Sequence, residues 1–328
     1  MKPVPPSSAA PLRTAVIEHP GLVLQRQIQL ILKRTEKPEL PSGIAPLDQV
    51  IMGFHRKTLT IVAGRPGEGK TALGCQFALN LAKEGKRVIY VSLEMPKGDI
   101  LERMLCNYCD FDSADLRRGV VPEDFHERAN EFMAFLETAS LRVTEAFGYK
   151  TKDIEQLLDD CGPQKPDVIF IDHVNKISGE GYPQRKDAVS NYTLEMERLA
   201  VQNDLAVVLL AQLNRKAMEG GRPSMEHLKE SGTLEEAAAT ILFLRWRTLD
   251  KERKNPSHDT AFEIIVGKQR YGDSGMNIEI EFHARRSKFS YYKQEVWDST
   301  EKAATNGSAP MAGIEASQPK ETSEEVPF

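Results

Sequence analysis

One glycine-rich stretch carries the residues needed to bind a triphosphate. It fits the pattern GxxxxGK[ST], lies between an apolar strand-like run and a helix-like run, and reads Gly64-Arg65-Pro66-Gly67-Glu68-Gly69-Lys70-Thr71. Its glycines let backbone N–H groups turn inward around a β-phosphate, and the following helix adds partial positive charge. Lys70 would bridge the β- and γ-phosphates, and the Thr71 hydroxyl would bind Mg²⁺. The stretch predicts a phosphate loop, against the alternative of a glycine-rich turn without nucleotide.

Two carboxylates follow apolar strand-like runs and could complete that chemistry. Asp172 closes the run 168–171, and Glu94 directly follows the run 88–93. In open α/β sheets such residues lie at strand carboxyl ends, beside the phosphate loop. We expect Asp172 to hold magnesium through water, with an ordinary strand-ending aspartate as the alternative. Glu94 could polarise the attacking water, but its position alone leaves that role undecided.

The elements around these residues form a repeating pattern. Continuous apolar runs, which predict strands, alternate with helix-like runs and occupy residues 58–63, 88–93, 141–143, 168–171 and 206–211. After residue 232 four strand-like runs follow with hardly a helix between them, at 240–244, 261–266, 276–282 and 288–292. Continuous apolar strands separated by helices indicate a parallel sheet covered on both faces. We therefore predict an α/β fold, a P-loop NTPase core with a mostly parallel twisted sheet, helices on both faces and antiparallel strands at the C-terminal end.

Composition and patterning suggest four segments. Residues 1–21 are a flexible Pro-rich arm, 22–40 a linker helix, 41–297 the ATPase domain and 298–328 a disordered acidic tail. The linker helix should run from Leu22 to Lys37, with its apolar stripe either in the core of its own domain or docked on another subunit.

The bulk numbers exclude several classes of protein. The chain has 328 residues, a net charge of −5 and a pI near 5.9, so any DNA contact must be local. No apolar run approaches a membrane span and the start lacks the core of a signal peptide, so we expect a cytoplasmic protein with no membrane partner. Four cysteines are too few for a disulfide scaffold, and free thiols are expected.

The order of these segments resembles the RecA-type motor domain of DnaB-like replicative helicases. Residues 92–95, Ser-Leu-Glu-Met, are similar to a family segment whose glutamate is the catalytic base, which favours that role for Glu94. Residues 211–215, Ala-Gln-Leu-Asn-Arg, resemble the family's Ser-Gln-Leu-Asn-Arg, and by resemblance Gln212 senses the γ-phosphate. The resemblance implies ATP and Mg²⁺ as cofactors.

Residues 228–232, Leu-Lys-Glu-Ser-Gly, resemble the family's Leu-Arg-Glu-Ser-Gly, part of a loop that follows single-stranded DNA. By resemblance Lys229, Glu230 and Gly232 are candidate DNA contacts, with Arg215 upstream. Lysine keeps the charge of the family's arginine but loses its bidentate fork. Without the resemblance this barely basic stretch would be interpreted as a solvated loop.

Residues 267–270, Gly-Lys-Gln-Arg, resemble the family's Ala-Lys-Gln-Arg, whose lysine and arginine reach the γ-phosphate bound by a neighbouring subunit. The spacing of two puts Lys268 and Arg270 on one side of an extended strand. A charged hairpin end in solvent is the alternative. The resemblance implies a homo-oligomeric ring, a hexamer, in which these residues act in trans.

The sequence therefore predicts an ATP-dependent, ring-forming replicative DNA helicase that moves on single-stranded DNA, 5′ to 3′ by resemblance. A RecA-like DNA-binding assembly factor or recombinase without unwinding activity is the alternative.

Three departures from the family pattern carry expectations of their own. Gly67 and Glu68 stand where Ser-Met is common, and His173 stands where Tyr is usual and should face away from Asp172 in a packing role. About 20 Pro-rich residues precede the linker helix, which suggests a short, collarless member such as a phage or mobile-element protein. The tip Glu324–Phe328 resembles the acidic Pro-Phe tip of single-strand-binding proteins. A plain disordered acidic tail is the more common interpretation, and docking on replication factors is the hypothesis that the resemblance suggests.

Overall fold

The computed structural model describes residues 19–32, 37–176, 185–214, 217, 221–228, 232–247 and 261–291. The chain divides into a unit of residues 1–291 and a unit of residues 292–328, and the second lies outside the described residues. Most of the Pro-rich arm, the acidic tail with its tip, and the candidate DNA contacts Arg215, Lys229 and Glu230 also lie outside them.

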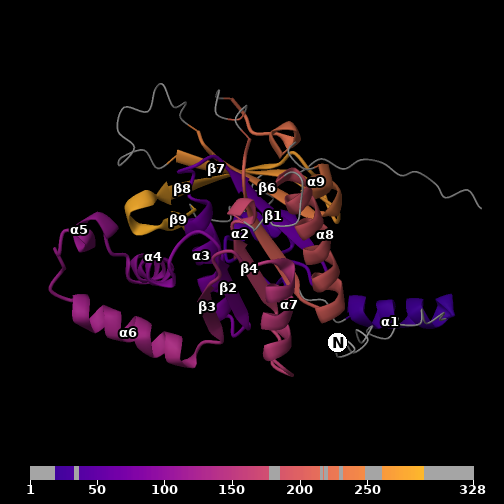
Figure 1. Ribbon diagram of the computed structural model, residues 1–328, viewed down its shortest axis with the longest axis horizontal. Helices are drawn as coiled ribbons and strands as arrows, with labels where there is room; N and C mark the ends of the chain where they lie inside the picture. Colours follow the sequence, from indigo (N-terminus) through magenta and orange to yellow (C-terminus); the bar gives the residue numbers. More distant parts are fainter. Residues whose placement is uncertain are drawn as a thin grey trace, which may run out of the picture. The chain divides into compact units, whose positions relative to one another are not determined.

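Within the described ranges, nine strands form one sheet (Figure 1). They are β1 Leu59–Gly64, β2 Val88–Ser92, β3 Leu141–Glu145, β4 Val168–Asp172, β5 Ala206–Gln212, β6 Thr240–Trp246, β7 Ala261–Gln269, β8 Asn277–His283 and β9 Lys288–Ser290. Their order across the sheet is β3-β2-β4-β5-β1-β6-β7-β8-β9. All neighbouring pairs from β3 to β6 are parallel, and the last three pairs are antiparallel. The predicted fold class is confirmed.

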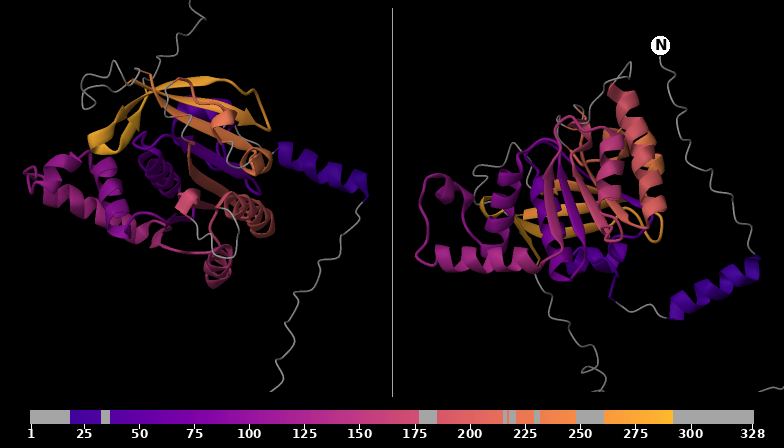
Figure 2. Two further views of the ribbon diagram at one scale, coloured as in Figure 1. Left: turned by 45° about the horizontal axis from the view of Figure 1, so that its top comes forward. Right: turned by 60° about the horizontal axis from the view of Figure 1, so that its bottom comes forward.

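Helices cover both faces of this sheet (Figure 2). The helices of the described ranges are α1 Pro20–Leu32, α2 Ala45–Ile51, α3 Lys70–Lys83, α4 Lys97–Cys109, α5 Ser113–Arg117, α6 Phe125–Thr138, α7 Thr151–Asp160, α8 Arg185–Asn203 and α9 Gly232–Ala237, with short 3-10 turns η1 Val174–Lys176, η3 Met225–Leu228 and η4 Ala284–Arg286. The described side chains of helix α1 contribute nothing to the core clusters that cover the sheet. One core cluster joins α2, α3 and α4 to one face, around Phe77 and Phe170. The other joins α7, α8 and α9 to the opposite face, around Tyr192 and Ile171.

Burial explains the two kinds of strand. Every residue of β1, β2 and β4 is buried, as expected where helices cover both faces. Residues of β8 alternate between more and less buried positions, as expected of an antiparallel strand with one wetter face. The parallel strands therefore place their carboxyl ends along one edge, where the loops that carry functional residues emerge.

The predicted end of the linker helix at Lys37 was wrong. Helix α1 ends at Leu32, and Lys37 lies in a bend, so the helical pattern does not extend to the residue before Pro38. This agrees with the bias of a residue that precedes proline against helical backbone angles. None of the helices in the described ranges combines the length and the apolar character that a membrane span requires.

Candidate active site

The glycine-rich stretch connects β1 to α3 in a tight loop. Gly67 and Gly69 have positive φ angles of 79° and 75°, a region that side-chain-bearing residues rarely adopt. A Cβ on Gly69 would also lie 2.7 Å from Phe282 Cε1, so the loop packs directly on the β8–β9 hairpin. Both glycines are therefore required by the backbone, which supports the prediction of a phosphate loop.

Lys70, the first residue of α3, lies inside this loop. Its Nζ donates to the carbonyl oxygens of Gly64 at 3.0 Å and Arg65 at 2.9 Å. Burial lowers the pKa of the ammonium, while the nearby carboxylates of Asp172, Glu68 and Glu94 act in the opposite direction. The structure thus holds a desolvated cation at the centre of the loop.

Asp172, the last residue of β4, lies beside the start of α3. Its side chain is 2% exposed, and Oδ2 accepts a hydrogen bond from the Tyr90 hydroxyl at 2.8 Å. The Thr71 hydroxyl also bonds this carboxylate. Burial raises the pKa of Asp172, and the hydrogen bonds from Thr71 and Tyr90 act against that rise. A hydroxyl and a carboxylate side by side are the hard oxygen ligands that Mg²⁺ prefers.

Glu94 lies just past the end of β2, and its carboxylate contacts an imidazole nitrogen and an ammonium group. Its Oε2 is 2.8 Å from His173 Nδ1, and its Oε1 is 3.0 Å from Lys176 Nζ. The backbone below it is tied to β4, because Leu93 N donates to Asp172 O at 2.6 Å. The Glu94 side chain remains 45% exposed, so it is positioned yet accessible to water.

The expectation that His173 faces away from this site was wrong. Strand β4 ends at Asp172, so the alternation of side chains does not continue to the next residue. The ring is buried, as a packing role requires, but its Nδ1 meets the Glu94 carboxylate. Burial lowers the pKa of His173, against the influence of the carboxylates of Glu94 and Asp172, which favours a neutral ring that donates to Glu94.

Sequence reasoning missed Tyr90 and Lys176 and misplaced His173. The period-two pattern of β2 puts Tyr90 on the same face as Ser92, which pairs in register with Asp172. A tyrosine in an otherwise aliphatic buried strand was the available signal, but its use requires knowing that β2 and β4 are neighbours. Lys176 gave no signal, because it lies in the short turn η1.

Gln212 ends β5 and pairs in register with Gly64 at the start of the phosphate loop. Strand β5 lies between β1 and β4, so this half-buried residue is placed between the loop and the strand that carries Asp172. The position agrees with the predicted sensor role, which stays a prediction.

Arg65 and Glu68, two other residues of the loop, form a buried pair. They are 8% and 5% exposed, and Arg65 Nη1 lies 3.3 Å from Glu68 Oε1. The backbone N of Arg65 donates to Glu68 Oε2 at 2.5 Å. The Arg65 guanidinium also donates to the carbonyl oxygens of Ala217 and Gly221, beyond the end of β5.

Lys268 and Arg270 lie away from their own chain's phosphate loop. Lys268 pairs with Ile241, which pairs with Ile61 near the start of β1, and Lys268 Nζ donates to the Glu235 carbonyl oxygen at the end of α9 at 2.6 Å. The exposed Arg270 donates its backbone N to Ala239 O at 2.8 Å, and Ala239 N in turn donates to Leu59 O at 2.8 Å. Both residues are therefore beside the beginning of β1, whereas the phosphate loop follows its end.

Comparison with known proteins agrees with this geometry. The family model for the DnaB-like helicase C terminal domain matches residues 39–291, most of the chain. The chain belongs to this family. The resemblance stated from the motifs is thereby confirmed.

Individual members of the DnaB-like family give the same picture. The chain is 31% identical over 266 residues to a probable plasmid replicative DNA helicase of Chlamydia psittaci, which covers 79% of this chain and 56% of that protein. It is 31% identical over 271 residues to the replicative DNA helicase DnaC of Bacillus subtilis, which covers 80% of this chain and 58% of that protein. The chain thus spans little more than half the length of these relatives. A solved structure of a DnaB-like replicative helicase shares the fold, with a TM-score of 0.74 at 23% identity over 81% of this chain and 67% of that one.

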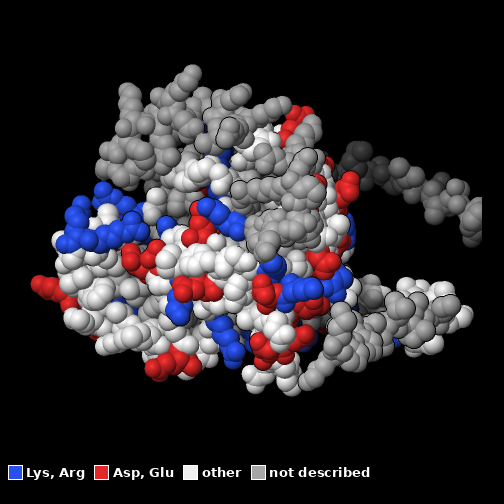
Figure 3. Space-filling model, viewed as in Figure 1, with Lys and Arg blue, Asp and Glu red and all other residues white. Residues whose placement is uncertain are grey.

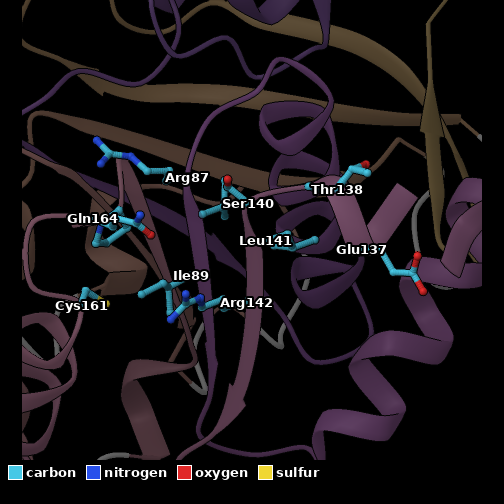
Figure 4. Close-up of a pocket in the computed structure, with 12 residues that line it drawn as sticks. Arg87, Ile89, Glu137, Thr138, Ser140, Leu141, Arg142, Cys161 and Gln164 are labelled. Carbon is cyan, nitrogen blue, oxygen red and sulfur yellow. The ribbon is translucent and has the colours of Figure 1, made fainter. Parts of the chain in front are cut away.

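A hollow of about 270 Å³ lies at the opposite edge of this DnaB-like fold, at the amino ends of β2 and β3 (Figure 4). Ile89 and Leu141 contribute apolar lining, while the polar ends of Arg87, Glu137 and Arg142 point in different directions. Ligand sites need a few polar groups that converge on one point. The hollow therefore does not compete with the phosphate loop as the candidate active site.

Surface charge adds little to the site on the face shown in Figure 3. Basic and acidic side chains are mixed over most of its described surface, and one basic cluster lies over α5 and η4. The exposed arginines of that region pair with acidic neighbours, for example Arg285 with Asp112 at 3.2 Å and Arg286 with Asp110 at 3.1 Å. The cluster is largely neutralised, in keeping with the prediction that DNA contact must be local.

Proposed function

We propose that this chain is the motor of an ATP-dependent, ring-forming replicative DNA helicase. The observation that carries the proposal is the placement of Glu94. This carboxylate is held between His173 and Lys176 at 2.8 and 3.0 Å, next to the strand whose end carries Asp172. A fixed, water-accessible carboxylate beside a phosphate loop has the position required to orient and deprotonate an attacking water.

The remaining residues have binding roles in this proposal. Backbone N–H groups of residues 64–69 and the Lys70 ammonium receive the ATP phosphates. The Thr71 hydroxyl and the Asp172 carboxylate, which already bond one another, hold Mg²⁺ directly or through water. The metal would neutralise charge on the phosphates, and Gln212 would sense the γ-phosphate beside Gly64.

Lys268 and Arg270 act in the site of a neighbouring subunit in this proposal. Leu59 and Gly64 are five residues apart in β1, which corresponds to about 16 Å at the usual strand rise. Arg270 lies beside the Leu59 end, through Ala239, so it is placed too far away to reach its own chain's loop. A heterologous, head-to-tail interface would bring it to the loop of the next subunit and generate a ring, for which the family suggests six subunits.

The apolar stripe of α1 supports assembly. Leu22, Leu24, Ile28, Ile31 and Leu32 are between 45% and 73% exposed. An apolar stripe of this kind is typical of a protein interaction site. We propose that α1 packs on a neighbouring subunit of the ring.

Single-stranded DNA is the proposed track. Gly232, the first residue of α9, is the described member of the candidate DNA contacts, which otherwise comprise Arg215, Lys229 and Glu230. Movement from 5′ to 3′ is proposed from the family resemblance. Docking of the tip Glu324–Phe328 on replication factors also stays a prediction.

A forked-DNA unwinding assay tests this function. The full chain with ATP and Mg²⁺ should separate the strands, and Glu94→Gln should bind ATP without separating them, because the water would lose its base. DNA binding with ATP hydrolysis but without strand separation would favour the assembly factor or recombinase.

A mixing experiment tests the shared site. Arg270→Ala and Glu94→Gln chains should each hydrolyse ATP poorly alone. In a mixed ring, about a quarter of the sites would combine an intact Glu94 with a neighbour's intact Arg270 in a heterologous interface. Recovery of hydrolysis on mixing is the expected result, and a mixture as inactive as its components would refute the trans role.

A further inference from the structure

We propose that Arg65 is a positioning residue that ties the segment after β5 to the phosphate loop and so couples nucleotide binding to DNA affinity. The inference rests on the proposed function, because residues 213–232 include the candidate DNA contacts. Its physical basis is the position of Arg65: the main chain of this residue is part of the phosphate loop, and its buried guanidinium is hydrogen-bonded to the segment after β5.

The contacts of the guanidinium are specific. Nε donates to Ala217 O, and Nη2 donates to Gly221 O at 2.8 Å, so two donors of one planar group hold two carbonyl oxygens four residues apart. Arginine offers such donors in a rigid fork, whereas lysine offers a single point charge. The Arg65 side chain is 10% exposed, which makes these charge-assisted bonds stronger than they would be in water.

Asn214 connects the start of the segment after β5 to residues near its end by hydrogen bonds. Asn214 Oδ1 accepts a hydrogen bond from Ala217 N at 3.3 Å, and Asn214 Nδ2 donates to Glu226 O at 3.2 Å. Asn214 N also donates to His227 O at 3.0 Å. A displacement of the Ala217 main chain would therefore change its hydrogen bond with Asn214, which is also bonded to Glu226 and His227.

The other end of the connection is Lys70. Its Nζ donates to the Arg65 carbonyl oxygen at 2.9 Å. The ammonium group that would bind the β- and γ-phosphates is therefore hydrogen-bonded to Arg65, whose side chain contacts Ala217 and Gly221. When Lys70 turns to a phosphate, the Arg65 main chain loses this bond. A contiguous set of contacts thus runs from Lys70 through Arg65 to Ala217 and Gly221, which is the arrangement by which energetic coupling between two sites can be carried.

Glu68 is a further partner of this guanidinium, beside the two carbonyl oxygens. Its carboxylate pairs with Arg65 at 3.3 Å inside a loop that must receive anionic phosphates. Without Arg65 this buried carboxylate would lose its guanidinium partner and would repel the triphosphate more strongly. Removal of Arg65 alone would therefore disturb nucleotide binding as well as coupling, so the test must separate the two effects.

The experiment measures the affinity of the full chain for a fluorescent oligothymidylate with and without saturating ATPγS and Mg²⁺. The ratio of the two dissociation constants is the coupling factor, typically about 5- to 150-fold in allosteric proteins. Arg65→Ala/Glu68→Gln removes both charges together, and Arg65→Lys keeps the charge but loses the fork. Both should lower the coupling factor about tenfold or to near one.

Two controls isolate the side-chain contacts. Glu68→Gln leaves the bonds from Arg65 to Ala217 and Gly221 available and should keep most of the coupling factor. Arg198→Ala removes an arginine that pairs with Glu155 and Glu195 away from the site, and it should not change the ratio. Thermal unfolding verifies that each variant is folded, and Arg65→Lys carries the test if the double variant is not.

The outcomes are distinct. A wild-type coupling factor in a folded Arg65→Lys or in the double variant, measured at nucleotide saturation, would overturn the role of Arg65 and leave the proposed helicase intact. Wild-type chain that binds no single-stranded DNA would overturn the proposed function, and the inference with it. A merely structural role of Arg65 would shift the unfolding temperature without changing the ratio.

Discussion

Two aspartates at opposite ends of strand β4 have opposite surroundings. Asp167 precedes the strand and Asp172 ends it, and they are 6% and 2% exposed. Asp167 receives hydrogen bonds from Arg56 Nη2 at 2.7 Å, Arg87 Nη2 at 3.0 Å and Arg87 N at 2.8 Å. Burial alone would raise its pKa, but these bonds bring the pKa well below its usual value. Among the described residues no arginine pairs with Asp172, and burial raises its pKa.

The comparison separates stability from chemistry. A carboxylate whose lone pairs are taken up by two guanidinium groups holds the amino edge of the sheet together. A buried carboxylate that accepts hydrogen bonds from the Thr71 and Tyr90 hydroxyl groups, with the His173 ring and the Lys70 charge nearby, keeps the capacity to bind a metal ion. The two ends of one strand are thus built for different purposes, and substitutions at the two ends should have different consequences.

The largest effect is expected for Asp172→Asn. Loss of the proposed magnesium ligand should lower kcat for ATP hydrolysis about 10³-fold, similar to other losses of charge stabilisation at an active site. The free energy of unfolding should stay the same or rise, because a neutral amide replaces a buried carboxylate whose pKa is raised. Steady-state hydrolysis and urea unfolding measure the two quantities. Hydrolysis at the wild-type rate would exclude Asp172 from the site.

The reverse pattern is expected for Asp167→Asn. Two half-buried guanidinium groups would lose their charged partner, which should lower the free energy of unfolding by about 2 kcal/mol. Hydrolysis per folded molecule should change little, because the residue lies at the far edge from the phosphate loop. Urea unfolding and kcat check this prediction, and a large loss of kcat with normal stability would break the comparison.

The pH dependence of stability gives a further test of the comparison between Asp167 and Asp172. The pKa of Asp167 is lowered in the folded chain, so its contribution is present above the unfolded pKa of about 3.9 and is lost as pH falls through the lower, folded value. The difference in free energy of unfolding between wild type and Asp167→Asn should be constant from about pH 5 to 8 and shrink in stronger acid. Unfolding curves across this range test the sign, which would be wrong if the difference grew on acidification.

The smallest effect is expected for Lys176→Ala. One of the two contacts that fix Glu94 would be lost, which should lower kcat about fivefold. The Lys176 side chain is 45% exposed, so stability should change by less than about 1 kcal/mol. Lys57→Ala, which breaks the exposed pair with Asp204 at 3.5 Å, is the matched control and should leave kcat unchanged. Equal kcat in the two variants would show that Lys176 does not position Glu94.

Most of the fold was predictable because its signals are local. Apolar runs predicted the parallel strands, and four further strand-like runs predicted β6 to β9 within a few residues. The phosphate loop and Asp172 were proposed from glycine spacing and from the end of an apolar run, whereas the role of Glu94 was proposed from the family resemblance. The roles of these residues stay predictions. Helices α2 and α5 were not predicted, since seven and five residues are too few for helical periodicity to register.

The rest of the site depends on contacts between strands that are distant in the sequence. The bond from Tyr90 to Asp172 requires β2 and β4 to be neighbours, and the bonds from Arg65 to residues beyond β5 require β5 to lie beside β1. His173 was misplaced because strand alternation was extended one residue past the end of β4. Strand order and strand ends are properties of the folded sheet, which residue patterns in one sequence do not specify.

The close approach of Gly69 to Phe282 has a consequence for biosynthesis. The phosphate loop comes early in the chain, but the Phe282 side chain that packs against it comes more than two hundred residues later. Gln76 of α3 is likewise hydrogen-bonded to the Phe289 main chain, at 2.6 and 2.8 Å. A ribosome-bound chain that has not yet extruded β8 and β9 therefore lacks the surface against which the loop rests. The nascent protein can acquire its finished nucleotide pocket only after β8 and β9 have left the ribosome.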